Sequence, residues 1–274
     1  MRTVFITGCA TGFGHLLARQ LLSEGHRVVA TDRTLGDWPE GLGAPNPRLL
    51  ALAMDVREAD QVREAVEQAI AWGPIDTLVN NAGHAVFGTQ EELDLELVRA
   101  MFDVNVLGLA RVTQALLPTL RERGGTVVQL SSVAGRTVFT ESGFYAASKY
   151  AVEAMTEALW QEVHHTNMKV RLIEPGSFDT QFLPTARLLS PEPPTGSPYA
   201  ALRPDWATRK EAALEPPQDP SLVVSAIVDS LADPRRFIRI PVGADSERIL
   251  ALRDRMGPDA FSIRAAERGL GDED

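Results

Sequence analysis

Short apolar runs alternate with longer amphipathic segments along almost the whole chain. The apolar runs are rich in β-branched residues and end in small or polar residues, a pattern typical of buried strands. These runs predict strands at residues 4–7, 27–31, 49–54, 75–79, 125–130, 169–173 and 237–240. Between them, apolar positions recur with the helical period at residues 15–22, 57–72, 93–121, 143–165, 221–231 and 246–256.

Repeated alternation of strand and helix predicts one α/β domain over residues 1–274, with no second domain. Its core would be a seven-stranded, doubly wound parallel sheet with helices on both faces. Right-handed crossovers and the usual strand order, 3-2-1-4-5-6-7, bring the carboxyl ends of the strands to one edge. Because open α/β sheets bind their ligands at that edge, we expect the functional site there.

Composition excludes several classes of function. The 274-residue chain has a net charge of −10 and its arginines are scattered among acids, which argues against a nucleic-acid partner. The single cysteine, Cys9, permits no internal disulfide and predicts a reducing compartment, so we expect the cytoplasm. We see no signal-peptide pattern, no apolar run approaching about 18 residues and no metal-ligand spacing, and so expect neither a membrane span nor a metal site.

A glycine-rich turn follows the first predicted strand. The sequence from Gly8 to Gly14 reads GCATGFG and leads directly into the helix at residues 15–22. Glycines let the backbone approach a pyrophosphate closely, and the amino end of a helix offers free N–H groups and a positive dipole end. Such a loop can also reflect close packing alone, but the order of strand, glycine turn and helix favours dinucleotide binding.

Asp32 and Arg33 follow the second predicted strand. An acid about 20 residues beyond the glycine loop is placed to accept hydrogen bonds from the adenosine ribose of NAD. Arg33 can instead pair with the 2′-phosphate of NADP, and the two residues can also form a surface ion pair. We give Asp32 the decisive role because its carboxylate repels the extra phosphate, so NAD is expected, with NADP as the alternative through Arg33.

Asparagines mark two further places in the pattern. The sequence NNAG, from Asn80 to Gly83, lies at the carboxyl end of the fourth predicted strand, although two consecutive asparagines can also form only a turn. Asn105 lies between Val104 and Val106 in a predicted helix. Because a buried amide is costly unless it is hydrogen-bonded, Asn105 either locks a helix bend or holds a water for the site, and these roles are compatible.

The stretch from Ser131 to Lys149 carries candidate acid–base chemistry. Ser132 ends the fifth strand region, and Tyr145 and Lys149 lie four positions apart on one face of the next helix. A neighbouring cation favours the phenolate, so we expect Lys149 to lower the pKa of Tyr145 from its reference value of about 10. A Tyr-x-x-x-Lys spacing alone is more often structural, so the assignment depends on the rest of the chain.

Residues 177–220 form a long, proline-rich connection after the sixth predicted strand. In a compact domain so long a connection is usually functional, so we predict a substrate lid, with a disordered insertion as the alternative. Its apolar side chains are expected to line a hydrophobic pocket. They are Phe178, Phe182, Leu183, Leu188, Leu189 and Trp206. Residues 269–274 predict a frayed acidic tail.

Taken together, these motifs resemble the short-chain dehydrogenase/reductase family from Thr3 to about Val242. The family's T-G-x-x-x-G-x-G loop matches residues 7–14, with Phe13 where isoleucine is commoner. Its N-N-A-G matches residues 80–83, and its P-G-x-x-x-T matches residues 175–180. The family's active-site asparagine, serine, tyrosine and lysine match Asn105, Ser132, Tyr145 and Lys149, with the serine 13 positions before the tyrosine. Within the family, the chain looks most similar to the branch of 17β-hydroxysteroid and retinol dehydrogenases.

The resemblance implies a Rossmann-like fold and an NAD(P)(H)-dependent oxidoreductase that interconverts a hydrophobic secondary alcohol and its ketone by hydride transfer. It implies that Tyr145 exchanges the hydroxyl proton and that Lys149 holds the nicotinamide ribose and lowers the tyrosine pKa. Ser132 would hydrogen-bond the carbonyl oxygen, and Asn105 would anchor a water that relays protons to Lys149. The implied cofactor-binding residues are Gly8, Thr11, Gly12, Phe13, Gly14, Asp32, Arg33, Asp55, Val56, Asn81, Ala82, Gly83, Tyr145, Lys149, Pro175, Gly176, Phe178 and Thr180.

Two other functions occur on the same kind of fold. A catalytically inactive, nucleotide-sensing regulator would be free to lose its tyrosine or lysine, whereas here all four of the family's active-site positions are filled. An isomerase or epimerase would need an internal redox cycle and usually a sugar-nucleotide domain, for which this chain is too short. Small residues along the helix at 143–165 permit close packing on a partner, so we expect a homodimer or homotetramer.

Overall fold

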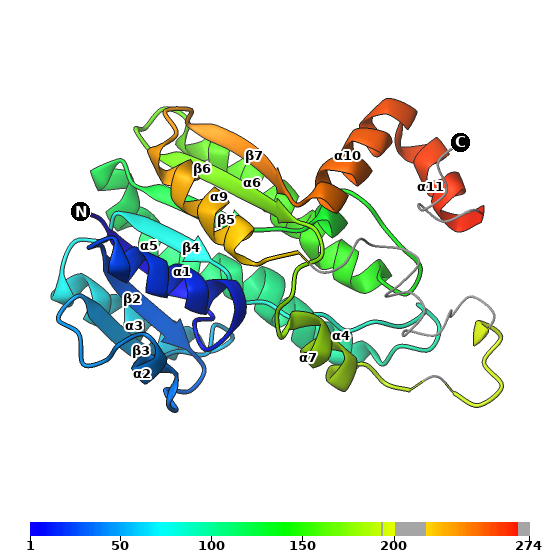
Figure 1. Ribbon diagram of the computed structural model, residues 1–274, viewed down its shortest axis with the longest axis horizontal. Helices are drawn as coiled ribbons and strands as arrows, with labels where there is room; N and C mark the ends of the chain where they lie inside the picture. Colours follow the sequence, from blue (N-terminus) through cyan, green and yellow to red (C-terminus); the bar gives the residue numbers. More distant parts are fainter. Residues whose placement is uncertain (193, 201–217, 268–274) are drawn as a thin grey trace.

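The fold is built on a parallel sheet of seven strands in the order β3-β2-β1-β4-β5-β6-β7 (Figure 1). The computed structural model describes residues 1–192, 194–200 and 218–267. The strands are β1 Thr3–Thr7, β2 Arg27–Asp32, β3 Leu49–Ala53, β4 Thr77–Asn80, β5 Thr126–Leu130, β6 Lys169–Pro175 and β7 Phe237–Val242. The predicted fold class, strands and strand order are therefore confirmed, with strand bounds that differ by one or two residues.

Helices connect the strands in chain order. The predicted ones are α1 Gly12–Ser23, α3 Ala59–Trp72, α4 Leu95–Phe102, α5 Leu109–Arg123, α6 Gly143–Val163, α9 Ser221–Ala232 and α10 Ala244–Met256. The structure adds α2 Trp38–Gly41, α7 Phe182–Leu189, α11 Pro258–Glu267 and the 3₁₀ turn η2 Val133–Gly135. Of these, α7 lies in the connection predicted as a lid, while Trp206 and the predicted acidic tail lie outside the residues that the structure describes.

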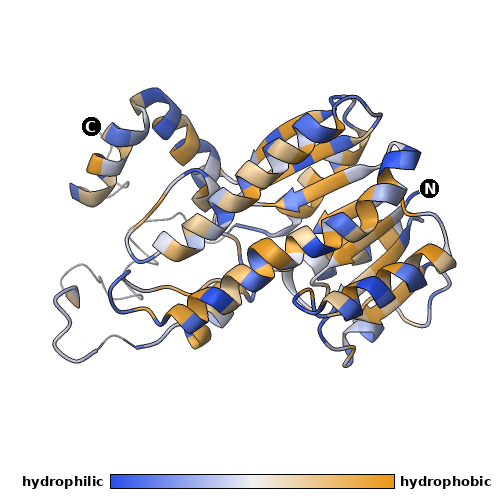
Figure 2. Cartoon of the chain, turned by 180° about the vertical axis from the view of Figure 1, so that it is seen from behind, coloured by the Kyte–Doolittle hydropathy of each residue, from blue (hydrophilic) through white to orange (hydrophobic). Residues whose placement is uncertain are grey.

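The two faces of the sheet are covered by different helices. Alternate residues of β1 point to opposite faces, so Val4 and Ile6 pack with α1 and α9. Phe5, between them, packs with α3, α5 and α6 on the other face. Seen from behind, hydrophilic and hydrophobic residues alternate along these helices (Figure 2). The apolar stripes therefore form two cores, one on each side of a buried sheet.

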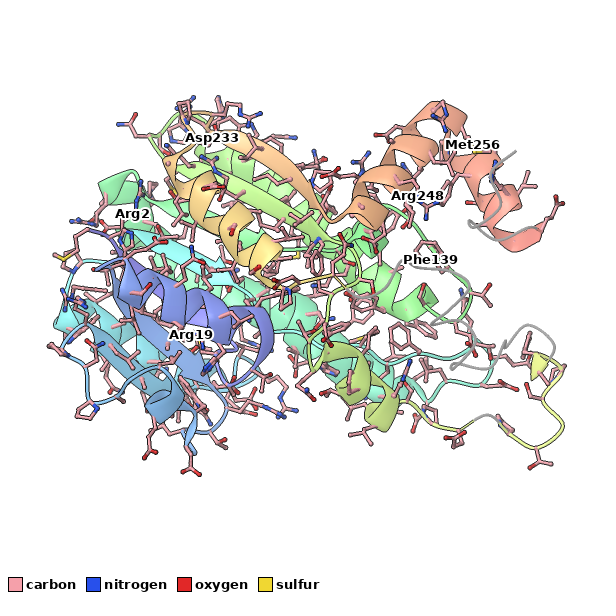
Figure 3. The ribbon with its side chains drawn as sticks, viewed as in Figure 1. Arg2, Arg19, Phe139, Asp233, Arg248 and Met256 are labelled. Atoms are coloured by element: carbon pink, nitrogen blue, oxygen red, sulfur yellow. The ribbon has the colours of Figure 1, made fainter. Side chains whose placement is uncertain are left out.

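The strand ends define the two ends of the molecule. β1 pairs with both β2 and β4, so the direction of winding reverses between β1 and β4. Arg2 and Asp233 lie at the end where strands begin, whereas Phe139 lies toward the opposite end, with α4 and α7 (Figure 3). All strands run the same way, so their carboxyl ends meet on the Phe139 side, as predicted.

The helical stretch predicted at 93–121 is interrupted by a π-helical segment, η1 Asp103–Gly108, between α4 and α5. Together the three segments form one helix, Leu95–Arg123, that is long and apolar enough to cross a membrane by length and composition alone. The sequence pattern predicts no continuous apolar run of about 18 residues and no membrane span, and one helix of this kind is weak evidence for a span. The second half of the helix presents Val112, Leu116 and Leu120 to the core of the sheet, and the core helix of a soluble protein passes the same test.

Candidate active site

The glycine turn between β1 and α1 is held to its neighbours by main-chain and side-chain hydrogen bonds. Gly8 N donates to Thr31 O of β2 at 2.9 Å. The Asn81 amide donates to the carbonyl oxygens of Thr7 and Gly8, each at 2.9 Å. The Thr7 hydroxyl accepts from the N–H groups of Asn81 and Ala82, each at 3.0 Å. The structure therefore brings the predicted loop and the predicted NNAG motif into direct contact.

Gly14 shows why a side chain is excluded from this turn. A Cβ atom on Gly14 would lie 2.1 Å from Gly8 O and 2.6 Å from Asn81 Nδ2. Thr11, which precedes α1, makes no side-chain capping hydrogen bond to the first turn of the helix. The turn thus places a helix amino end, without a side-chain cap, at the carboxyl edge of the sheet, as a pyrophosphate site requires.

Asp32 and Arg33 lie where β2 ends, next to the glycine turn. One carboxylate oxygen of Asp32 accepts from Ala10 N at 2.8 Å, and the other accepts from Arg33 N at 2.8 Å. Asp32 therefore uses its carboxylate to tie β2 to the loop. The alternative of a surface ion pair between the two side chains is not what the structure contains, because the contact runs through the backbone of Arg33.

Asp55 and Val56 follow β3 on the same edge. Val56 is buried, and its side chain faces Gly108, where a Cβ would lie 2.6 Å from Val56 Cγ2. Asp55 forms an ion pair with Arg57 at 2.6 Å, and this contact holds the pKa of the Asp55 carboxyl below its usual range. Sequence reasoning missed Arg57, whose position two residues after the acid was the available signal.

Asn105 lies in the π-helical segment and locks it to the loop after β4. Its Oδ1 accepts from His84 N at 3.0 Å, and its Nδ2 donates to His84 O at 2.8 Å and to Ser148 Oγ at 3.1 Å. A Cβ on Gly83 would lie 3.1 Å from Asn105 Oδ1, so the last glycine of NNAG makes room for the amide. Of the two roles predicted for Asn105, the structure contains the locking one.

Ser132, Tyr145 and Lys149 come together where β5 ends and α6 begins. The Ser132 hydroxyl accepts from Ala134 N at 3.1 Å and lies beside the Tyr145 phenol, where it acts to lower the pKa of that phenol. Lys149 Nζ donates to Leu130 O, the last residue of β5, at 2.8 Å. The strand thus anchors the lysine one helical turn below the tyrosine, as the four-residue spacing predicts.

Burial shifts both titratable groups of this trio. It raises the pKa of Tyr145 to about 12, against the lowering effect of the Ser132 hydroxyl. It lowers the pKa of Lys149 to about 8, and the Glu153 carboxylate opposes that change. We expected Lys149 to lower the tyrosine pKa; in this structure burial dominates instead, because charged forms of both groups lose their hydration.

The segment after β6 reaches back to the glycine turn. The ring of Phe178 meets that of Phe13 edge-on, with centroids 5.7 Å apart. A Cβ on Gly12 would lie 3.9 Å from Thr180 Cβ. The predicted motifs at residues 7–14 and 175–180 therefore face each other across the edge of the sheet.

Asp245 fixes the start of that segment and was missed by sequence reasoning. Its buried carboxylate accepts from Ser177 N at 2.7 Å and from Gln218 Nε2 at 2.8 Å. A Cβ on Gly176 would lie 1.9 Å from Asp245 Oδ1, so only glycine fits beside it. Asp245 lies in α10, far along the chain, and no local pattern signals the contact.

Aromatic rings pack around the Tyr145 side chain. The centroid of the Phe87 ring lies 5.9 Å from that of Tyr145, and the Phe182 ring lies 5.7 Å away. Phe87 N donates to Ser190 Oγ at 2.8 Å, which ties the loop after β4 to the end of α7. Of the predicted apolar lining, Phe178 and Phe182 lie beside site residues, whereas Leu188 is largely exposed.

These features fit a nicotinamide dinucleotide. The compact glycine turn, the uncapped helix end and Asp32 lie together at one side of the edge, and the serine, tyrosine and lysine lie at the other. The segment beginning at Pro175 adjoins both, because its carbonyl accepts from Ser132 Oγ at 3.5 Å. The same edge can therefore hold an extended ligand with one end near Asp32 and the other near Tyr145.

Comparison with known proteins agrees with this arrangement. The sequence profile of the family described as short chain dehydrogenase matches residues 2–188, which is more than half of the chain. The chain belongs to the short-chain dehydrogenase family. As a short-chain dehydrogenase it carries the site described above almost entirely within the matched residues, and the contacts of Asp245 lie beyond them.

Several curated relatives cover the same part of this short-chain dehydrogenase. Retinol dehydrogenase 7 of Mus musculus is 41% identical over 184 residues, 65% of this chain and 57% of the relative. Human 17-beta-hydroxysteroid dehydrogenase type 6 is 40% identical over 185 residues, also 65% and 57%. A 3-ketodihydrosphingosine reductase of Bacteroides thetaiotaomicron is 39% identical over 181 residues, 65% of each chain. The matched part spans less than two thirds of these relatives, and it confirms the predicted branch of the family.

Solved structures extend the likeness to the whole fold. A short-chain dehydrogenase from Streptomyces avermitilis superposes with a TM-score of 0.81 at 31% identity, covering 97% of this chain and 94% of its own. A 3-ketoacyl-(acyl-carrier-protein) reductase from Brucella melitensis, solved as a complex with NADH, gives a TM-score of 0.73 at 25% identity, covering 89% and 98%. The doubly wound fold is thus shared over nearly the full length of the chain.

Proposed function

We propose that this short-chain dehydrogenase is an NAD(P)(H)-dependent oxidoreductase that interconverts a hydrophobic secondary alcohol and its ketone. The observation that carries the proposal is the trio of Ser132, Tyr145 and Lys149, gathered at the edge of the sheet that also holds the glycine turn. A phenol and an ammonium one helical turn apart, beside a dinucleotide site, suit proton transfer coupled to hydride transfer.

Each member of the trio has a distinct task. The chemistry that a bound nicotinamide supplies is hydride transfer. Tyr145 gives its proton to the oxygen of the ketone, or takes one from the alcohol. Ser132, which lies beside the phenol, orients the same oxygen, and Lys149 stabilises the phenolate that remains. With a pKa of about 12 the phenol is protonated at neutral pH, the form in which it can donate a proton to a ketone oxygen.

The apolar surroundings of Tyr145 support a hydrophobic substrate. Phe87 and Phe182 pack against the tyrosine ring, so a substrate oxygen that reaches the phenol meets aromatic side chains. The curated relatives are named for retinol, a 17-beta-hydroxysteroid and 3-ketodihydrosphingosine. We extend that apolar class of substrate to this chain, and we assign residues 177–220 the role of a lid over it.

For the cofactor we propose NAD in preference to NADP. The Asp32 carboxylate is fixed by Ala10 N and Arg33 N at the end of β2, where a 2′-phosphate would meet its negative charge. Arg33, the next residue, is the group through which NADP binding would proceed. Water held at Asn105, relaying protons to Lys149, remains part of the proposal.

The remaining proposals concern the setting of the enzyme. Exposed Leu95 and Leu107, on α4 and η1, support a homodimer or homotetramer that covers them. The single cysteine, Cys9, is buried and reduced, which supports the cytoplasm as the compartment.

Replacement of the phenol tests the proposal. We expect Tyr145→Phe to lower kcat for reduction of apolar ketones by about 10³-fold, because the general acid is lost. Dinucleotide affinity, measured by fluorescence titration with NADH and NADPH, should stay near that of the parent protein. Tyr150→Phe, an exposed tyrosine of the same helix, is the matched control and should leave kcat unchanged. If Tyr145→Phe keeps activity within about tenfold of the parent, the catalytic assignment is wrong.

A further inference from the structure

A buried group of charged side chains lies one helical turn beyond Lys149, which we call the carboxylate cluster. It comprises Glu153 of α6, Glu174 of β6, Arg239 of β7 and Arg136, which follows η2. Tyr145, Lys149 and Glu153 are successive four-residue steps along α6, so they share one face of the helix. The cluster therefore continues the line of the catalytic trio into the protein.

Glu153 is the member of the cluster next to Lys149. Its residue is 7% exposed, and its Oε2 accepts from Arg239 Nε at 3.1 Å. Its other oxygen, Oε1, is buried without a hydrogen-bond partner and faces the space left by Gly135, where a Cβ would lie 3.1 Å from it. Arg239 thus holds Glu153 from one side only, and the free carboxylate oxygen leaves its charge little shielded.

Glu174 occupies the far side of the cluster and behaves differently. It is fully buried, and neither carboxyl oxygen makes a hydrogen bond. Its nearest cations are Arg239 Nε at 3.7 Å and Arg136 Nη1 at 3.8 Å. Both arginines also pair with exposed acids, Arg136 with Asp254 at 2.6 Å and Arg239 with Glu157. Burial, reinforced by the charge of Glu153, raises the pKa of Glu174 to about 7.

Such a cluster contributes little to the stability of the fold. Buried carboxyl oxygens without hydrogen bonds are costly, and apolar residues of similar size often serve a core equally well. The cluster does supply one thing that an apolar core cannot, which is a negative charge beside a buried ammonium. Burial pulls the pKa of Lys149 down, and the charge of Glu153 acts in the opposite direction.

We propose that Glu153 is a positioning residue for Lys149: its buried carboxylate, held by Arg239, keeps the neighbouring ammonium charged while Tyr145 exchanges its proton. The inference rests on the proposed function, in which a charged Lys149 stabilises the phenolate. The charged groups that face Glu153 are Lys149 and Glu157 on its own helix, Glu174 on β6 and Arg239 on β7. Arg136 and Asp254 reach the cluster through Glu174.

The sign of the effect follows from these charges. Glu153 lies one helical turn from Lys149, and its charge acts to raise the pKa of the Lys149 ammonium. Removing its charge leaves burial unopposed, so the ammonium loses its proton at lower pH. Removing the charge of Glu174 instead leaves the charge of Glu153, one helical turn from Lys149, in place.

Direct titration of Lys149 tests the inference without any turnover. The chain has only three lysines, Lys149, Lys169 and Lys210, so ¹³Cε-lysine labelling gives an NMR spectrum that single lysine replacements can assign. We expect the pKa of Lys149 in Glu153→Gln to lie about one pH unit below that of the parent protein. Glu174→Gln is the matched buried variant of the same cluster. In that variant the pKa of Lys149 should stay within about 0.3 units of the parent value, because a more distant charge has a smaller effect. Lys169, at the amino end of β6, is the internal reference and should not move.

Kinetics supply the second readout. In Glu153→Gln, the apparent pKa of the alkaline limb in the pH profile of kcat for ketone reduction should fall by about one unit. Glu153→Asp keeps the charge, so its alkaline limb should lie close to that of the parent protein. Equal shifts in the two glutamine variants, or an unmoved Lys149 in Glu153→Gln, would overturn the inference. If Glu153→Gln does not fold, Glu153→Met replaces it, because an apolar side chain of similar size removes the charge without burying an unpaired amide; an unmoved Lys149 in Glu153→Met contradicts the inference. Failure of the proposed function is separate, because it is read from Tyr145→Phe and leaves the NMR titration unaffected.

Discussion

The two halves of the catalytic edge hold their functional groups in different ways. In the dinucleotide half, an uncharged side chain and close backbone packing hold the glycine turn: the Asn81 side-chain amide donates to the carbonyls of Thr7 and Gly8, and Gly14 approaches Gly8 too closely for any side chain. In the acid–base half, buried side chains do it, and burial shifts the pKa values of Tyr145 and Lys149 in opposite directions.

This difference predicts opposite sensitivities. A site made from backbone shape should be intolerant of added volume and almost indifferent to pH, because it contains few titratable groups. A site made from buried titratable side chains should accept variants of equal size that keep the charge, and should respond sharply to pH and to lost charge. The same type of substitution, made once in each half, should therefore show whether that half depends on shape or on charge.

The largest effect is expected from added volume in the glycine turn. In Gly14→Ala the new methyl group must move away from Gly8 O, which forces α1 off the end of β1. We expect a loss of about 3 kcal/mol in the free energy of unfolding, at the upper end for an overpacked site. Chemical denaturation measures the loss, and titration with NADH should show that dinucleotide binding is lost with it.

Gly12→Ala is the matched control in the same turn. Gly12 has a φ of +60°, but a Cβ there has open space, with Thr180 Cβ at 3.9 Å as its nearest neighbour. Only the left-handed backbone conformation then opposes the substitution, at about 1 kcal/mol. Equal destabilisation by the two variants would mean that backbone strain, and not close approach, explains the glycines of this turn.

A second, smaller effect is expected from removal of charge in the dinucleotide half. Asp32→Asn keeps the size of the side chain but removes the charge that opposes a 2′-phosphate, so we expect the ratio of NADPH to NADH affinity to rise about tenfold. Arg33→Ala should lower that ratio, because it removes the nearest cation for the phosphate. Fluorescence titrations with each cofactor measure both. An unchanged ratio in Asp32→Asn would show that shape, even here, outweighs charge.

Sequence alone predicted the fold, and it predicted which motifs would meet at the candidate site, because both follow from local patterns. Strand and helix periods predicted the elements, and right-handed crossovers with the usual strand order predicted the topology. The glycine turn, NNAG and Tyr-x-x-x-Lys each follow a strand end, so this topology brings them together. Contacts between residues that lie far apart along the chain were not predicted. Asp245 meets Gly176 from α10, and Glu174 meets Glu153 through the packing of β6 on α6, and neither contact leaves a periodic trace.

The sequence also could not predict the direction of a pKa shift to which burial and a neighbouring charge contribute with opposite signs. Spacing correctly indicated that Lys149 lies one turn from Tyr145, but the direction of the tyrosine pKa depends on burial, which the spacing does not contain. The π-helical turn at Asn105 is a similar case. An asparagine between valines signals a buried amide, yet only the structure shows that the helix widens there to reach His84.

The smallest effect is expected where the acid–base half meets the segment after β6. Ser190 Oγ accepts from Phe87 N at 2.8 Å and donates to Ala186 O at 2.6 Å, so it joins α7 to the loop whose phenylalanine packs on Tyr145. Ser190→Ala removes an acceptor worth about 1 kcal/mol, and we expect KM for an apolar ketone to rise about fivefold. Because no group of the trio is touched, kcat should stay within about twofold, in contrast to Tyr145→Phe.

Ser262→Ala is the matched control for that substitution. Its hydroxyl donates to Pro258 O within exposed α11, at 3.0 Å, and touches no residue of the site. We therefore expect Ser262→Ala to have the KM and kcat of the parent protein in steady-state kinetics. A fall in kcat without a change in KM for Ser190→Ala would mean that the contact orients Tyr145 itself, and the segment after β6 would then belong to the acid–base half and not to substrate binding.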